Sequence, residues 1–157
     1  MGVCDIIFRA KRIDDGEWIE GFLFSTNEHT YIAYPNQFDD DLFLSPKEIF
    51  IEVDHETVCQ YTGYKDDTGK KIFEGDIVGF EDMTSTESGY YEMGCCGKVC
   101  YDEEEACFHV TDRLSAESWE VLGECHIIGN IFDNPELIGE QLSLVLWFGN
   151  WTKISSL

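Results

Sequence analysis

The turn Glu74-Gly75-Asp76 has one carboxylate on each side of a glycine, and a pair of acidic residues at this spacing is a candidate for catalysis or cation binding. Paired carboxylates can hold a cation or act as the acid and the base of a hydrolase. A glycine between them allows a positive φ, and Asp76 can accept hydrogen bonds from the amides of its own turn. No histidine or third carboxylate stands at a fixed spacing from the pair. We therefore expect a structural turn, assign no catalytic residue, and keep a hydrolase that uses Glu74 and Asp76 as the least favoured alternative.

The seven cysteines raise the question of a zinc site. Three residues separate Cys96 from Cys100, and Cys107, Cys125 and His126 could complete a tetrahedral set of ligands. Zinc sites usually present two close pairs of ligands around a loop, whereas the later candidates here are scattered along the chain. We therefore expect no metal and no other cofactor, and we interpret the cysteines as reduced thiols in a cytosolic compartment.

Aromatic residues gather around the same turn, at Tyr61, Tyr64, Phe73 and Phe80. Because a small barrel needs bulky side chains in its interior, we expect Phe73 and Phe80 in the core. For Tyr61 and Tyr64 two interpretations stay open: a place in the core, or a place in a groove that binds an extended peptide. Together with Glu74 and Asp76, these two tyrosines are the candidate binding residues.

The charge of the chain is strongly one-sided. There are 32 Asp and Glu residues against 10 Lys and Arg, which gives a formal net charge of −22. Acidic residues outnumber basic ones in residues 1–50, 51–100 and 101–157 alike, so no basic face is expected. Because neutralisation of phosphates supplies most non-specific affinity for nucleic acid, direct binding to DNA or RNA is disfavoured. Two interpretations stay open: an acidic solvated surface, or a decoy that presents a DNA-like field to a nucleic-acid-binding protein.

Most segments alternate apolar and polar residues with the period of two that is typical of strands. Asp14-Asp15-Gly16 separates two such runs, residues 6–11 and 18–24, and this arrangement predicts a β-hairpin. Ser45-Pro46-Lys47-Glu48 is typical of the start of a short helix. Further strands are expected at residues 30–34, 57–61, 77–80, 98–101, 107–111, 119–122 and 126–132.

The fold expected from this pattern is mainly β. Short strands joined by tight turns over residues 57–133 suit a small closed barrel of the SH3-like type. We expect three regions: N-terminal β-hairpins over residues 1–56, the barrel over 57–137, and an apolar tail over 138–157.

Three blocks of sequence, in this order, resemble the YopX-like family of phage and prophage proteins: Ile7-Phe8-Arg9-Ala10, the run Thr57–Val78 and the run Ile127–Leu137. The resemblance covers about residues 6–137. It implies an all-β barrel with short peripheral helices and a setting in the cytoplasm of a bacterial host, and the family carries no assigned reaction. We expect the structural positions of the motif to be Gly63, Gly69, Gly75, Gly129, Asn130 and Pro135.

The tail contains the apolar run Leu142–Phe148. This run is much shorter than the roughly 20 residues that cross a bilayer, so we expect no membrane association. It is rich in strand formers, and we expect it to add to a sheet or to a neighbouring subunit.

These observations favour a non-enzymatic, phage- or prophage-encoded cytosolic protein that binds a protein partner and forms a homo-oligomer. The alternative is an acidic, nucleic-acid-mimicking inhibitor that occupies the DNA- or RNA-binding surface of a host protein. The two differ in the force that drives binding, because a contact made mainly by charge is screened by salt.

Overall fold

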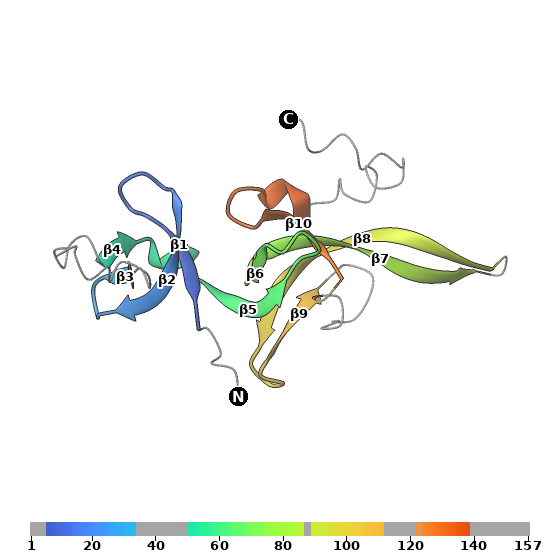
Figure 1. Cartoon of the computed structure of the whole chain (residues 1–157), viewed down its shortest axis with the longest axis horizontal. Coiled ribbons are helices and arrows are strands. Elements are labelled where there is room, and N and C mark those ends of the chain that lie inside the picture. The colour runs from blue at the N-terminus through green and yellow to red at the C-terminus, as the bar shows by residue number, and fades with distance from the viewer. Residues whose placement is uncertain (1–5, 34–49, 87–88, 112–121, 123, 139–157) are drawn as a thin grey trace. The chain divides into compact units, whose positions relative to one another are not determined.

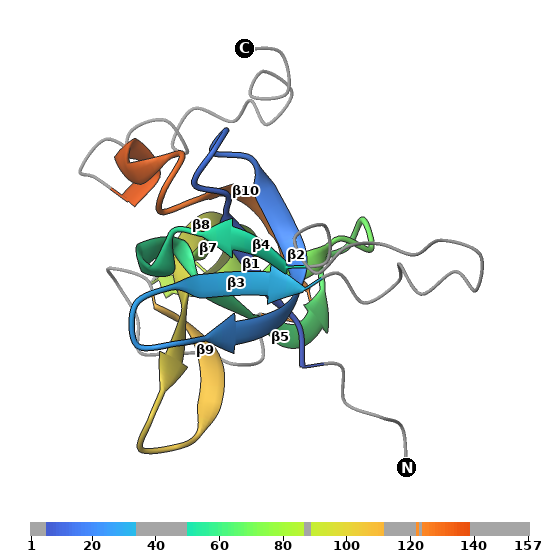
Figure 2. The ribbon, with the colours of Figure 1, turned by 90° about the vertical axis from the view of Figure 1, so that its left-hand side faces the viewer.

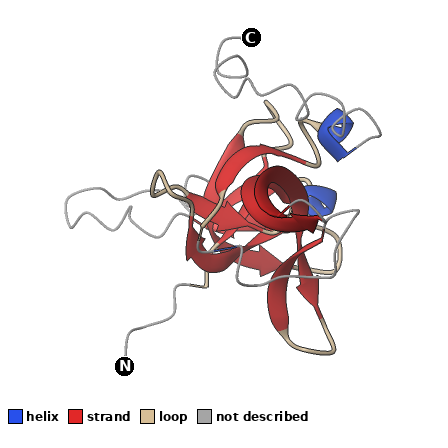
Figure 3. Cartoon of the chain, turned by 90° about the vertical axis from the view of Figure 1, so that its right-hand side faces the viewer, coloured by secondary structure: helices blue, strands red, loops and turns tan. Residues whose placement is uncertain are grey.

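A computed structural model of the chain describes residues 6–33, 50–86, 89–111, 122 and 124–138. The described residues form two antiparallel sheets, of six and of four strands, which confirms the mainly β prediction (Figure 1). No α-helix occurs in this part of the chain, and its helical pieces are short 3₁₀ turns, blue in Figure 3. Each sheet belongs to its own compact unit, and each unit is described by itself below.

The first unit contains the six-stranded sheet, with the strands in the order β4-β3-β2-β1-β5-β6. Three of its strands, β2, β3 and β4, lie side by side in Figure 2. The predicted hairpin is confirmed, because the first strand pairs antiparallel with the second and Arg9 lies opposite Glu20. The bounds are β1 Phe8–Lys11, β2 Trp18–Ser25, β3 Thr30–Ala33, β4 Phe50–Val53, β5 Cys59–Lys65 and β6 Lys71–Phe73.

Alternate residues of these strands form the core of the first unit. Ala10, Ile19, Ile32 and Val53 are buried and pack as one cluster. Phe8, Leu23, Ile51 and Val58 are partly buried and pack against that cluster. Since side chains alternate between the two faces of a strand, burial of this set sends the residues between them to the opposite face.

The end of β1 is also joined to the end of β4. Arg12 forms a bridge with Val53, and the amide of Asp54 donates to the carbonyl of Lys11 at 2.8 Å. Asp54 then caps the 3₁₀ turn η1, His55–Thr57, because its side chain accepts from the amide of Glu56. These bonds fix the chain where it leaves β4.

The second unit contains the four-stranded sheet, in the order β10-β7-β8-β9. Its interior is formed by small and branched side chains that are almost fully buried, including Ile77, Val78, Val99 and Val110. A 3₁₀ turn, η3 Pro135–Ile138, follows the last strand. The bounds are β7 Asp76–Thr86, β8 Gly89–Asp102, β9 Cys107–Thr111 and β10 His126–Asn130.

The predicted SH3-like closed barrel over residues 57–133 is not found in the described part of the chain. β5, which opens that range, pairs with β1, so that Phe8 lies opposite Gln60. The amide of Tyr61 donates to the carbonyl of Ile7 at 2.8 Å, and the amide of Glu74 donates to the carbonyl of Gln60 at 2.9 Å. β5 and β6 therefore belong to the first sheet, and the later strands form an open sheet of their own.

Three predictions lie outside the described residues: the helix start at Ser45-Pro46-Lys47-Glu48, most of the strand at 119–122, and the apolar run Leu142–Phe148. In the described part of the chain, no helix is long and apolar enough to cross a membrane.

The core of the first unit makes a quantitative prediction. Ile32 is fully buried, so Ile32→Ala removes packed methyl groups and leaves a cavity. We expect a loss of about 3 kcal/mol in the free energy of unfolding, measured by urea denaturation. The matched control Ile13→Ala changes a residue that is 61% exposed, and it should cost less than about 0.5 kcal/mol. Equal losses in the two variants would contradict the assignment of the core.

Candidate functional site

The face of the first sheet opposite its core carries four aromatic residues, which we call the aromatic face: Phe22, Phe24, Tyr31 and Phe50. Strand register brings them together. Phe24 lies opposite Tyr31, while Ala33 lies opposite both Phe22 and Phe50. Phe22 and Phe24 are each 52% exposed and Phe50 is 41% exposed. Three large apolar side chains from β2 and β4, the strands on either side of β3, are thus available to solvent on one surface.

The rings of the aromatic face contact one another. The centroids of Phe24 and Phe50 lie 5.9 Å apart, and those of Phe24 and Tyr31 lie 6.5 Å apart. Such tilted pairs restrict the rings of Phe24, Tyr31 and Phe50, so these three side chains lose less freedom on binding. Full burial of a phenylalanine is worth roughly 1.5–3 kcal/mol, and about half of that gain is still available here.

Charged side chains lie beside these aromatic residues. His29 packs on Tyr31 at 6.2 Å between ring centroids, and its Nδ1 lies 2.6 Å from Oε1 of Glu52. Glu20, which precedes Phe22 on the same side of β2, accepts from Nζ of Lys71 at 2.7 Å. These partly exposed pairs add little to stability, but they give the apolar surface a polar rim.

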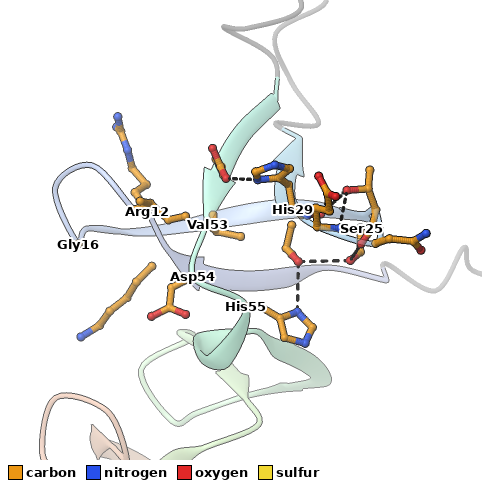
Figure 4. A pocket seen from close by; sticks show the side chains of 14 residues that line it. Arg12, Gly16, Ser25, His29, Val53, Asp54 and His55 are labelled. Carbon is orange, nitrogen blue, oxygen red and sulfur yellow. Dashed lines mark hydrogen bonds and ion pairs between the residues drawn. The ribbon is translucent and has the colours of Figure 1, made fainter.

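An open hollow of about 700 Å³ lies at the end of β2, β3 and β4 (Figure 4). Ser25 Oγ lies 3.3 Å from Thr30 Oγ1, which in turn lies 3.2 Å from Nδ1 of His55. Thr30 is buried, so this chain of polar groups joins the β2–β3 turn to η1. His55 therefore contacts the hydroxyl of buried Thr30 and reaches Ser25 only through it, so Ser25 lacks direct contact with a base.

The two predicted carboxylates lie in different surroundings. Glu74 is partly exposed and is bonded through its amide to Gln60 in the first unit. Asp76 begins β7 in the second unit and is 1% exposed. Between them Gly75 has φ of 77°, and its carbonyl accepts from the amide of Ile131 at 2.9 Å. This geometry is that of a tight turn held by backbone bonds, and the catalytic alternative stays a prediction.

The predicted core phenylalanines are confirmed, because Phe73 and Phe80 are both buried. Tyr61 is half-buried, with its ring 5.6 Å from that of Phe73, whereas Tyr64 is 43% exposed. Arg9 lies over the rings of both Trp18 and Phe73, at 4.8 and 4.7 Å from the centroids.

The motif positions taken as structural lie where the backbone conformation or its close contacts restrict the choice of residue. Gly63 and Gly69 have φ of 89° and 86°, values that residues other than glycine rarely adopt. A Cβ on Gly129 would lie 2.7 Å from Oδ1 of Asn134. Asn130 Oδ1 accepts from the amides of Phe132 and Asp133, and Pro135 begins η3.

Cys100 and Cys125 carry thiols that are not part of a disulfide bond. Among the described residues, no group of three His, Cys, Asp or Glu side chains is placed to hold a metal ion. Cys125 is buried, and burial, followed by the nearby charges of Asp66, Asp67 and Asp76, raises the pKa of its thiol to about 11. A thiol of this kind stays protonated at neutral pH, so it is a poor nucleophile.

Asp66 holds the turn Asp66-Asp67-Thr68-Gly69 together. Its Oδ1 accepts from the amide and the hydroxyl of Thr68, at 3.0 and 2.7 Å, and from the amide of Lys70 at 2.8 Å. Its Oδ2 accepts from the amide of Ile127 in β10 at 3.3 Å. Burial alone would raise the pKa of this carboxyl, but the four hydrogen bonds outweigh burial and hold the pKa below the ordinary value of 3.8.

Sequence reasoning missed the aromatic face. The signal was present in the alternation of Glu20, Phe22 and Phe24 with Ile19 and Leu23. Both sets contain large apolar residues, so the period of two predicted a strand without showing which set is buried.

A family model described as YopX protein matches residues 7–139 of the chain. No curated protein matches it.

The Asp66 carboxylate makes the stability of the protein depend on pH. Because its pKa is lower in the folded state, its contribution is complete above the ordinary value of 3.8 and is lost as the pH falls through the folded pKa. We expect Asp66→Asn to be less stable than the parent at neutral pH and to lose less stability between about pH 5 and about pH 2.5. The control Asp67→Asn changes an exposed neighbour whose side chain makes none of these four bonds, and its stability at neutral pH, measured by urea unfolding, should stay within about 0.5 kcal/mol of the parent. A profile unchanged in Asp66→Asn would contradict this role.

Proposed function

The chain belongs to the YopX protein family, and from this premise we propose that it is a non-enzymatic protein-binding module, encoded by a phage or prophage and active in the cytoplasm of the bacterial host. The observation that carries the proposal is the aromatic face, which leaves Phe22, Phe24 and Phe50 half-exposed on one side of a sheet. Single exposed apolar residues are ordinary on protein surfaces, whereas several together with a polar rim are typical of interaction sites.

The chemistry of this surface favours a protein ligand. Rings held by contacts with each other can bury against apolar side chains at a low cost in entropy, and aromatic residues are enriched at the centres of protein interfaces. The net charge of −22 opposes the approach of a nucleic acid. The same net charge favours a partner segment that combines large apolar side chains with Lys or Arg.

A second copy of the chain is the competing occupant of this surface. Self-association remains part of the proposal for the protein as a whole, since the apolar run Leu142–Phe148 is rich in strand formers. On the aromatic face itself, two copies would also bring together two molecules of charge −22, and this repulsion favours a basic partner.

The proposal predicts that random peptides selected on the immobilised full-length protein combine aromatic or aliphatic residues with Lys or Arg. A selected peptide should bind Phe24→Ser about tenfold more weakly than the parent, because one central ring is worth about 1.4 kcal/mol or more. Titration calorimetry gives the affinities. The control Tyr101→Ser removes a similarly exposed aromatic residue from β8 of the second unit and should bind as the parent does.

Three outcomes would overturn the proposal: no peptide enriched over the naked support, peptides without basic residues, or equal binding to Phe24→Ser and the parent. Sedimentation of the parent and of Phe24→Ser separates the competing occupant. A dimer that only Phe24→Ser dissociates would assign the surface to a second copy.

A further inference from the structure

Among the described residues, the distal half of the β7–β8 hairpin is a ribbon of two strands. β7 and β8 pair continuously from Ile77 opposite Lys98 to Thr86 opposite Gly89. β10 pairs with β7 only up to Gly79, and β9 pairs with β8 only from Lys98 onward. Figure 1 shows this half of the hairpin extending past both neighbours. We call the part formed by residues 81–86 and 89–94 the ribbon.

The chain before β10 turns away from the edge of β7. His126 lies opposite Gly79, but the carbonyl of Cys125 accepts from the amide of Asp67 at 3.1 Å. The amide of Ile127 also donates to Asp66 Oδ2. The Asp66 turn thus draws the start of β10 toward itself, and in the described residues no strand continues beside β7 beyond Gly79.

An open edge of this kind can accept another strand. Every second residue of β7 in the ribbon directs its backbone N–H and C=O groups away from β8, where they can pair with an added strand. A two-stranded hairpin is marginally stable in water, and a third strand adds backbone hydrogen bonds to it. The edge from Glu81 to Thr86 has six residues, about 20 Å of strand.

The charge of the ribbon selects the kind of strand that would bind. Glu81, Asp82 and Glu92 lie within it, and no Lys, Arg or His occurs between Phe80 and Gly97. A second copy would bring the same acidic ribbon to the edge, and like charges beside one another are destabilising in a sheet.

We propose that the edge of β7 at residues 81–86 binds a Lys- or Arg-rich extended segment of another protein as an added strand. Backbone hydrogen bonds supply the pairing, and the carboxylates of the ribbon favour a basic sequence over others. This site is separate from the aromatic face, which belongs to the other unit, so the two proposals stand or fall independently.

The test uses two peptides of the same composition and charge, binding to the full-length protein at low salt. One is six Lys-Thr repeats of L-residues, and the other alternates L-Lys with D-Thr. D-threonine at every second position favours backbone angles of the opposite sign, so the second peptide fits poorly beside the twisted strand of an L-chain. We expect the all-L peptide to bind about tenfold more tightly, and amide exchange to slow at residues 81–86 only with that peptide.

A charge-matched pair of variants locates the site. Glu81→Gln, Asp82→Asn and Glu92→Gln together remove three carboxylates from the ribbon. Glu103→Gln, Glu104→Gln and Glu105→Gln remove three from the exposed β8–β9 turn, whose backbone is held by Asp102. The ribbon variant should lose the preference for the all-L peptide, with binding about tenfold weaker, while the turn variant should retain the preference.

Equal binding of the two peptides would overturn the proposal, because it would show attraction by net charge alone. So would equal losses in the two variants, slowed exchange outside the ribbon, or no binding of the all-L peptide up to about 1 mM. Circular dichroism of both variants establishes that each keeps the parental fold.

Discussion

Burial of Ala10, Ile19, Ile32 and Val53 against one another decides which side of each strand in the first sheet faces solvent. A shift of one residue in register would turn every side chain to the other face, so this core also fixes the aromatic face. Arg12, which follows β1, forms a bridge with Val53 at the end of β4, and this bridge holds the ends of these two strands together. The exposed rings of Phe22, Phe24 and Phe50 are thus a consequence of the core, and they persist as long as the core does.

The two proposed surfaces use different forces. The aromatic face offers apolar area, whose contribution to binding depends little on salt. The ribbon offers backbone groups and carboxylates, and its attraction for a basic segment is screened as salt increases, with a Debye length of about 10 Å at 0.1 M. The charge of −22 acts on both, since it raises the rate of encounter with basic partners and opposes self-association. Binding at the ribbon should therefore weaken more steeply with added salt than binding at the aromatic face.

Local features of the fold could be predicted from the sequence, and long-range pairing could not. Asp14-Asp15-Gly16 marks the first hairpin, and Phe73 and Phe80 are core residues as expected. The prediction of a closed barrel was wrong because the sequence pattern predicts a strand at residues 57–61 without naming its neighbour. The observed strand, Cys59–Lys65, pairs with β1. The aromatic face was not predicted for a related reason, because β2 has large apolar residues on both sides. Only its pairing with β1 and β3 shows that Ile19 faces the core and Phe22 faces solvent.

The most direct test of the central claim is NMR mapping of a selected peptide on the isotopically labelled full-length protein. The account predicts that the amide signals of β2, β3 and β4 shift most, around Phe22, Phe24, Tyr31 and Phe50, with intermolecular contacts from the peptide to these rings. Shifts confined to other strands, or contacts to the opposite, core-forming face alone, would contradict the claim that the exposed aromatic side of the first sheet is the binding surface.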